Sequence, residues 1–332
     1  MEPALMVWRC DMIRFFIWTF LLFVLLVSGF VGAIYLDFSE VFKNDTLAHS
    51  IFFELRLPRV IFAFAAGAIL SLCGLLYQSL FRNALMTPYT LGVSSGAILG
   101  AGIAIKLGLG SLAFGIASIS LFGFFGAMLS VLLLLYLARF LKHSHFESLL
   151  LLGIALSLFY TSALMIIFYL GSALQNDMLL RFSMGSLSII GWVHPVTLSI
   201  IAIFLFVSIF AYRHELQLLS ISDEGAKLRG VDTKKVTLLL LLISSFAIGV
   251  LVSVSGPIGF VGLIVPHIVA KLYKEPINKR ITKTALFGGF FLVFCDTITR
   301  AIPSQSELPI GIITALIGGP FFIYLIISRS KG

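Results

Sequence analysis

The sequence has few charged residues and few cysteines, and it lacks the phosphate-binding motif of an ATPase. Charged residues make up 11% of the 332 residues, against about a quarter in a soluble globular domain. Cys10, Cys73 and Cys295 are far apart and form no CxxC motif, so neither a disulfide framework nor a zinc site is predicted. No Gly-Lys dipeptide occurs, which excludes a Gly-x-x-x-x-Gly-Lys-Ser/Thr phosphate loop. The sequence therefore argues against an ordinary soluble domain and against an ATPase of that type.

Apolar residues dominate instead, at 59% of the chain with a mean hydropathy of +1.09. A helix that spans a bilayer needs roughly 20 apolar residues, and charge-free runs of that length or more recur. These runs are residues 15–36, 60–81, 84–105, 107–138, 148–176, 182–212, 236–270 and 308–328. The pattern predicts an all-α integral membrane protein.

Two adjustments turn these runs into about ten transmembrane helices. The run 236–270 is interrupted by Gly256-Pro257, and because proline removes a backbone donor we expect a full span followed by a short helix. A further span is expected around Asp296, with its charged residues near the outer end. The predicted spans are residues 14–35, 57–80, 90–107, 112–138, 147–171, 190–212, 235–255, 260–273, 283–302 and 308–328.

The basic residues indicate the orientation of these spans. Ten spans place both termini on one side, and that side carries seventeen of the 23 Lys and Arg residues. The other side carries six, which are Lys43, Arg56, Arg59, Lys106, Arg181 and Arg300. The positive-inside rule then places both termini in the cytoplasm. The net charge of +8 follows from this topology, so nucleic-acid binding is not expected, and residues 1–332 are expected to form one transmembrane domain.

The spans contain few residues that could couple transport to an ion. Only Asp296, His194 and His267 lie in or near apolar runs, whereas proton-coupled carriers use acidic or histidine relays. A driven transporter with this sequence is expected to take its energy from a partner. An ion-coupled secondary carrier is the alternative from another class. A membrane enzyme is disfavoured, because no nucleophile and base lie at a workable spacing.

The polar segment 218–235 is where such a partner could act. Ser222 can cap a short helix, Asp223 and Glu224 suit its positive N-terminal end, and Gly230 suits its stop. On these residues alone, an ordinary amphipathic connector is the preferred interpretation.

Three groups of motifs resemble those of one transporter family. The first group comprises RLPRV at 56–60, QSLFRNAL at 78–85 and LGVSSGA at 91–97. The second is the loop 223–231, and the third comprises SGPIGFVGLIVPHI at 255–268, ELPIG at 307–311 and GGPFF at 318–322. In this order they resemble the FecCD-type permeases, the transmembrane subunits of type II ABC importers for ferric siderophores, haem and vitamin B12.

The resemblance implies an assembly in the bacterial inner membrane. Two copies of a ten-helix permease, or one copy with a paralogous permease, would enclose a pore in contact with membrane lipid. Two cytoplasmic ATP-binding subunits would supply the energy, and a periplasmic binding protein would deliver the substrate. The chain itself would then be no enzyme and would need no cofactor and no resident metal.

The resemblance also implies roles for individual residues. The ATPase interface would include Glu224, Ala226, Leu228, Gly230 and Val231. Binding-protein docking would use Arg56, Arg59 and Arg300, because guanidinium groups make bidentate contacts with carboxylates. The alternative for these arginines is contact with lipid headgroups.

A cytoplasmic gate is the third implied site. It would include Asn83 and Leu85, and the segment His143–His145 would help to form the same constriction. Ala84 stands where the family usually has proline, which makes this loop less rigid than in its relatives.

Two residues near the spans are interpreted as structural, and the substrate stays open. A solitary His267 provides no metal coordination shell, and Asp296 is expected to pair with Arg300 one turn along the same helix. Iron chelates such as siderophores, ferric citrate or haem are the commonest substrates of the family, with vitamin B12 and oxyanions as alternatives.

Overall fold

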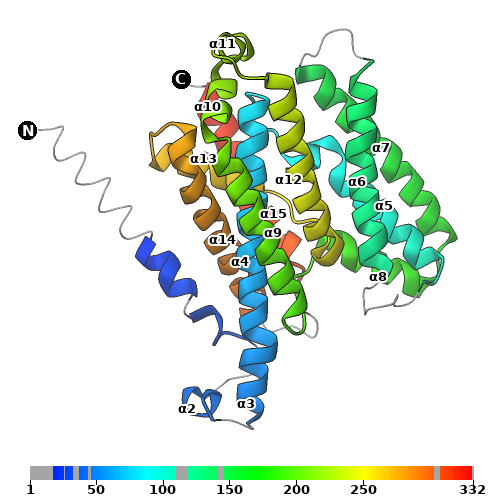
Figure 1. Ribbon diagram of the computed structural model, residues 1–332. Helices are drawn as coiled ribbons and strands as arrows, with labels where there is room; N and C mark the ends of the chain where they lie inside the picture. The colour runs from blue at the N-terminus through cyan, green and yellow to red at the C-terminus, as the bar shows by residue number, and fades with distance from the viewer. Residues whose placement is uncertain are drawn as a thin grey trace, which may run out of the picture.

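The computed structural model describes residues 18–25, 27–32, 37–43, 46–109, 118–140, 146–302 and 307–330, which form helices and no strands (Figure 1). Residues 18–25 are helical, and the later elements follow in chain order. They are α2 (Phe38–Val41), α3 (Leu47–Ser50), η1 (Ile51–Arg56), α4 (Leu57–Leu80), η2 (Pro88–Leu91), α5 (Val93–Lys106), α6 (Ser118–Ala138), α7 (Phe146–Leu170), α8 (Ala173–Met184), α9 (Val193–Ala211), α10 (Arg213–Ile221), α11 (Asp223–Leu228), α12 (Thr233–Ser255), α13 (Val261–Leu272), α14 (Ile277–Ala301) and α15 (Ile310–Ser330).

The predicted all-α membrane fold of about ten spans is confirmed. Within the described residues, six helices are long and apolar enough to cross a membrane. They are the continuous segment Leu47–Leu80, α6, most of α7, α9, α12 and α14. Three shorter apolar helices, α5, α13 and residues 310–325 of α15, and the helical residues 18–25 account for the other predicted spans.

Both adjustments made from the sequence agree with the observed helix ends. Helix α12 ends at Ser255 and α13 begins at Val261, and Gly256 between them has a φ of +67°. Helix α14 continues through Asp296 to Ala301. Helices α8 and α10 were not predicted, because each is too short and too polar to register as a span. Helix α8 is nucleated locally by a capping box between Ser172 and Gln175.

Helix α4 lies at the centre of the bundle, and 20 of its 24 residues are buried. It packs against α9, α12, α13 and α14. A Cβ atom at Gly67 would overlap the carbonyl group of Gly288 in α14, and one at Gly74 would overlap that of Gly262 in α13. Only glycine allows the backbones to come this close.

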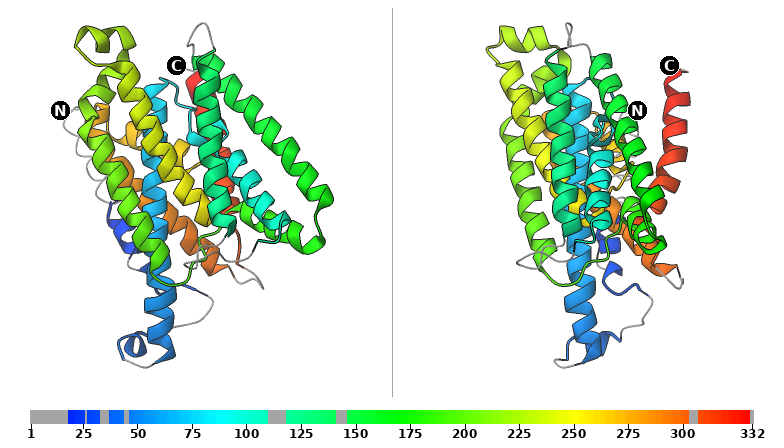
Figure 2. Two further views of the ribbon diagram at one scale, coloured as in Figure 1. Left: turned by 45° about the vertical axis from the view of Figure 1, so that its right-hand side comes forward. Right: turned by 90° about the vertical axis from the view of Figure 1, so that its right-hand side faces the viewer.

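Helices α5 to α8 form a second group beside this central bundle, joined to it where α6 and α5 pack against α12 (Figures 1 and 2). Helix α11 and the C-terminal end of α15 lie at one end of the molecule, and α2 and α3 lie at the other (Figure 2). The N-terminus is outside the described residues. The molecule therefore has two separate ends, with α11 at one and with α2 and α3 at the other.

Candidate functional site

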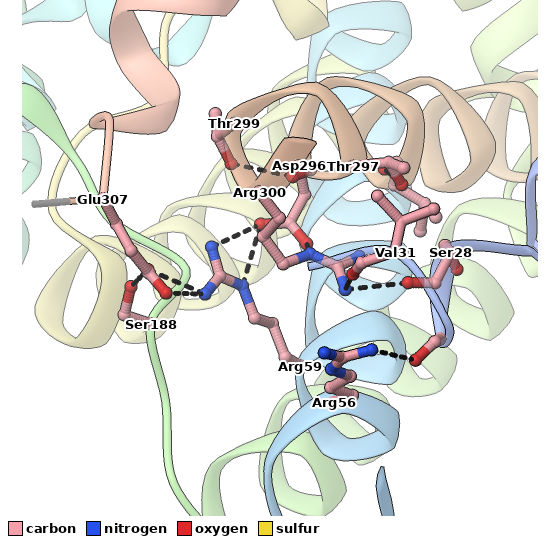
Figure 3. Close-up of polar contacts among 12 residues, drawn as sticks. Ser28, Val31, Arg56, Arg59, Ser188, Asp296, Thr297, Thr299, Arg300 and Glu307 are labelled. Atoms are coloured by element: carbon pink, nitrogen blue, oxygen red, sulfur yellow. Dashed lines mark hydrogen bonds and ion pairs between the residues drawn. The ribbon is translucent and has the colours of Figure 1, made fainter. Parts of the chain in front are cut away.

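Arg59 is the centre of a buried polar cluster at the end of the bundle that carries α2 and α3 (Figure 3). Its Nε donates to Oδ1 of Asp296 at 2.9 Å. Its Nη1 donates to both carboxylate oxygens of Glu307, at 2.9 and 2.7 Å. The side chains of Arg59 and Asp296 are 9% and 1% exposed. Arg59 thus joins α4 to α14 and to the segment that leads into α15.

Arg56 and Arg300 flank this cluster and hold the end of the N-terminal helical region. Nη1 of Arg300 donates to the backbone oxygens of Ser28 and Val31 at 2.7 and 2.9 Å. Nη1 of Arg56 donates to the backbone oxygen of Phe30 at 2.8 Å. Cationic groups at the C-terminal end of a helix satisfy its last carbonyl groups and oppose its dipole. The two arginines therefore fasten this helix end to η1 and α14.

A cavity of about 730 Å³ lies beside the cluster. It is lined by Gly32, Ile51, Leu55, Arg56, Arg59, Ser188, Ile189, Ile190, Thr299, Arg300, Ala301, Ile302 and Glu307. The cluster contains three guanidinium groups and the two carboxylates of Glu307 and Asp296, so one positive charge is in excess. Nη2 of Arg300 is buried and makes no hydrogen bond within the described part of the chain. The excess of positive charge suits a carboxylate or another anion in the cavity.

Glu307 is the most accessible acidic member of the cluster, with 53% of its side chain exposed. Burial raises the pKa of Glu307. A hydrogen bond donated by Ser188 and the charge of Arg59 together lower it by more than burial raises it, so the pKa of Glu307 lies below its ordinary value. A depressed carboxyl pKa stabilises the folded state above the pKa of the unfolded chain, and that stability is lost as the pH falls through the lowered value. The Glu307 contacts are therefore intact at neutral pH.

Helix α11 lies at the opposite end of the bundle (Figure 1). The Ser222 side chain accepts a hydrogen bond from the backbone N–H of Gly225 at 3.3 Å, as the sequence predicted. Gly230 has a φ of +81°, and the backbone N–H of Val231 donates to Ala226 at 3.1 Å, which closes the helix. The Ala226 side chain is buried, whereas Leu228 is 89% exposed. The helix thus presents Leu228 away from the bundle.

The loop after α4 lies next to α11. Nη2 of Arg82 contacts Oδ2 of Asp223 at 3.2 Å, and this ion pair joins the loop to the first turn of α11. Oδ1 of Asn83 accepts a hydrogen bond from the backbone N–H of Leu85 at 2.9 Å, which shapes the turn. Leu85 is exposed. The structure therefore brings the residues expected at the gate and those expected at the ATPase interface together at one end of the bundle.

Matches to known proteins give this arrangement a family. The model of the FecCD transport family matches residues 20–328. The chain belongs to the FecCD transport family. This FecCD permease is a multi-pass membrane protein.

Curated relatives cover most of its length. The hemin transport system permease of Yersinia pestis is 33% identical over 320 residues, covering 94% of this chain and 95% of the relative. A probable iron chelatin transport system permease of Helicobacter pylori is 35% identical and covers 85% of this chain and 83% of the relative. The vitamin B12 import system permease of Salmonella typhi is 32% identical, covering 84% of each. The FecCD permease is therefore the permease subunit of an ABC importer of the metal-chelate, haem and vitamin B12 type.

Solved structures agree with this assignment. A structure assigned to the metal-chelate type of ABC transporter, in an inward-facing conformation, superposes with a TM-score of 0.84 at 26% identity. It covers 96% of this chain and 99% of that chain. A second structure, PsaBC from Streptococcus pneumoniae in complex with Fab, superposes with a TM-score of 0.58 at 15% identity and shows a shared fold.

The sequence identified some members of the arginine cluster and missed others. The predicted pairing of Asp296 with Arg300 is confirmed by a contact of 3.0 Å between Oδ2 and Nε. The contacts of Glu307 with Arg59 and with Ser188 were not predicted. The available signal was the acidic residue directly before Leu-Pro-Ile-Gly, but nothing local indicates its partner 248 residues away.

The histidines named from the sequence lie in two different parts of the chain. The segment His143–His145, expected at the cytoplasmic constriction, lies outside the described residues. His267 lies in α13, and its ring faces Phe321 of α15 at a centroid distance of 6.0 Å. Within the described residues no group of three potential metal ligands occurs.

Proposed function

We propose that this FecCD permease imports an iron chelate, such as a ferric siderophore, ferric citrate or haem, from the periplasm to the cytoplasm. The observation that carries the proposal is its similarity over at least 85% of the chain to hemin and iron chelatin permeases. The vitamin B12 permeases, at 32% identity, favour vitamin B12 as the second candidate substrate. An oxyanion is a third, weaker candidate, and an ion-coupled carrier is the alternative outside the family.

The proposed assembly has two copies of the permease, or one copy and a paralogue, in the bacterial inner membrane with both termini in the cytoplasm. Large apolar side chains cover the outer faces of α7 and α9, among them Leu158, Tyr169, Ile200 and Ile203. Such faces suit contact with lipid tails or with a second copy. The separation of α11 from the arginine cluster supports two docking surfaces, one on each side of the membrane.

We propose that α11 and its C-terminal turn contact the separate ATP-binding subunits, which carry out all ATP hydrolysis. The interface comprises Glu224, Ala226, Leu228, Gly230 and Val231. An exposed leucine in a polar segment beyond the spans supports a protein partner at this place. Within this interface, the buried Ala226 and the left-handed turn at Gly230 serve to orient the helix.

We propose that the binding protein docks at the arginine cluster formed by Arg56, Arg59 and Arg300. All three guanidinium groups already contact groups within this chain. Docking through Arg59 would therefore exchange Glu307, its exposed partner, for a carboxylate of the binding protein. The excess positive charge and the adjoining cavity favour such an exchange.

We propose that Asn83 and Leu85 form part of the cytoplasmic gate. The turn that they share places an exposed leucine beside α11, where a small shift could open or close an apolar constriction. The pore needs no catalytic group, because the permease changes access to the substrate and leaves its bonds intact.

Uptake measurements test this function. The permease, its ATP-binding subunits and its binding protein would be produced in cells without iron-chelate or vitamin B12 importers. Uptake of radioactive iron as a siderophore complex, as ferric citrate and as haem would be compared with uptake of labelled cobalamin. Iron uptake that requires the ATP-binding subunit is expected. Uptake of cobalamin alone would identify the second candidate, and uptake by the permease alone without ATP would overturn the proposal.

A further inference from the structure

We propose that the Arg82–Asp223 ion pair mechanically links α11, the coupling helix at the proposed ATPase interface, to the loop after α4. Through it, a nucleotide-driven movement of α11 would pull on the loop that carries Asn83 and Leu85. The inference rests on the proposed function and adds Arg82 and Asp223 as positioning residues.

The first supporting observation is where the ion pair lies in the chain. Its two residues are 141 positions apart, and they join α11 to the central helix of the bundle. Helix α11 otherwise packs mainly against α10 and α12, its neighbours in sequence. Arg82 directly precedes the turn that Asn83 makes with Leu85. A pull on the Arg82 side chain therefore acts on this turn and on the end of α4.

The second observation is the backbone of Arg82. The N–H of Arg82 donates to Ser79 and the N–H of Asn83 donates to Gln78, at 3.4 and 3.2 Å. These two bonds form a Schellman motif at the end of α4, in which Arg82 occupies the left-handed position with a φ of +50°. Glycine normally occupies this position, because a Cβ atom strains the backbone there.

The same motif at the end of α11 shows the usual choice. There Gly230 holds the left-handed position, with a φ of +81°, and the bonds from Gly230 to Lys227 and from Val231 to Ala226 have the same pattern. Backbone stability alone would favour glycine at position 82 as well. An arginine in this conformation points to a role for its side chain, and the side chain reaches Asp223.

The ion pair is expected to contribute to the transmission of movement more than to folding stability. Both side chains are about half exposed, at 43% and 51%, and ion pairs of this kind contribute little to folding stability. Asp223 also lies in the first turn of α11, where its negative charge is favourable. Loss of the pair should therefore change transmission and leave folding intact.

Helix α4 gives the link a long reach. Its 24 residues span about 36 Å. Arg59 pairs with Asp296 and Glu307 near one end, and Arg82 pairs with Asp223 just beyond the other. A single buried helix thus connects the arginine cluster to the coupling helix.

The test measures substrate transported per ATP hydrolysed, in vesicles that contain the permease with its ATP-binding subunits and binding protein. Arg82→Glu and Asp223→Arg should each lower this ratio by about threefold. The double variant with both changes should restore it to near the wild-type value, because the pair is re-formed with reversed charges. Arg82→Gly should also lower the ratio, although glycine suits the left-handed position and should keep or raise Tm.

A matched control uses the exposed ion pair at the other end of the bundle, in which Nε of Arg181 lies 2.8 Å from Oδ2 of Asp177. Arg181→Glu should leave the ratio unchanged. Unchanged ratios in Arg82→Glu and Asp223→Arg would overturn the link, and so would a double variant no better than the single ones. A fall in Tm for Arg82→Gly with an unchanged ratio would make Arg82 merely structural. Absence of ATP-dependent uptake in the wild type would overturn the proposed function itself, which separates the two failures.

Discussion

Glu307 accepts two hydrogen bonds from a single nitrogen of Arg59, yet more than half of the Glu307 side chain is open to solvent. Asp296 holds the other side of the same guanidinium and is fully buried. Arg59 therefore has one permanent partner and one that a carboxylate from outside could replace. Charge reversal of Arg59 would disturb both partners, so it would not separate docking from folding.

Glu307→Gln should strengthen docking of the binding protein by about threefold to fivefold, because it removes the charge that competes for Arg59. The change keeps the size of the side chain. Titration of the purified permease complex with the binding protein would give the Kd. An unchanged or weaker Kd would show that Glu307 does not compete with the partner.

Asp296→Asn should lower the free energy of unfolding by about 3 kcal/mol, because two buried arginines, Arg59 and Arg300, would lose their shared counter-charge. Thermal unfolding in detergent, followed by circular dichroism, would measure the loss. Asp177→Asn provides the control, since Asp177 pairs with Arg181 in the exposed part of α8 and its loss should cost less than about 1 kcal/mol. Equal effects of the two changes would contradict a structural role for the buried cluster.

Gly230→Val should reduce transport while the complex still hydrolyses ATP. A β-branched residue is strained at a φ of +81°, so the end of α11 should reorganise and the ATPase interface should shift. Gly225→Ala is the control, because Gly225 lies inside α11 and an added Cβ atom there meets only ordinary contacts. Full coupling in Gly230→Val would argue against this turn as part of the interface.

Gly74→Val should prevent correct assembly of the bundle, because its side chain would overlap the backbone of Gly262. Yield of monodisperse permease in size-exclusion chromatography would report the effect. Gly319→Ala, where an added Cβ atom meets nothing within 4 Å, should give the wild-type yield. Normal yield of Gly74→Val would show that α4 and α13 can separate at this point.

Local sequence patterns were sufficient to predict most of the fold. Long apolar runs give the spans, Gly256-Pro257 gives the break between α12 and α13, and Ser222 and Gly230 give the limits of α11. Each of these signals acts over a few residues. Helices α8 and α10 escaped prediction because short, partly polar helices carry no hydropathy signal of their own.

The candidate site was less predictable, because its contacts join distant parts of the chain. The sequence indicated that Arg56, Arg59 and Arg300 would lie on one side of the membrane, but their contacts with Asp296, with Glu307 and with backbone oxygens depend on packing. The left-handed backbone conformation of Arg82 could not be predicted from the sequence for another reason. Glycine marks such a position in a sequence, and here arginine occupies it.

The glycine contacts of α4 restrict how this permease can move. Where Gly67 meets Gly288 and Gly74 meets Gly262, the backbones lie so close that a single added Cβ atom would overlap the neighbouring helix. Helices α4, α13 and α14 are therefore expected to move together as one rigid unit. A switch between the two membrane faces is then expected to move the helices around this unit, and not these three helices against one another.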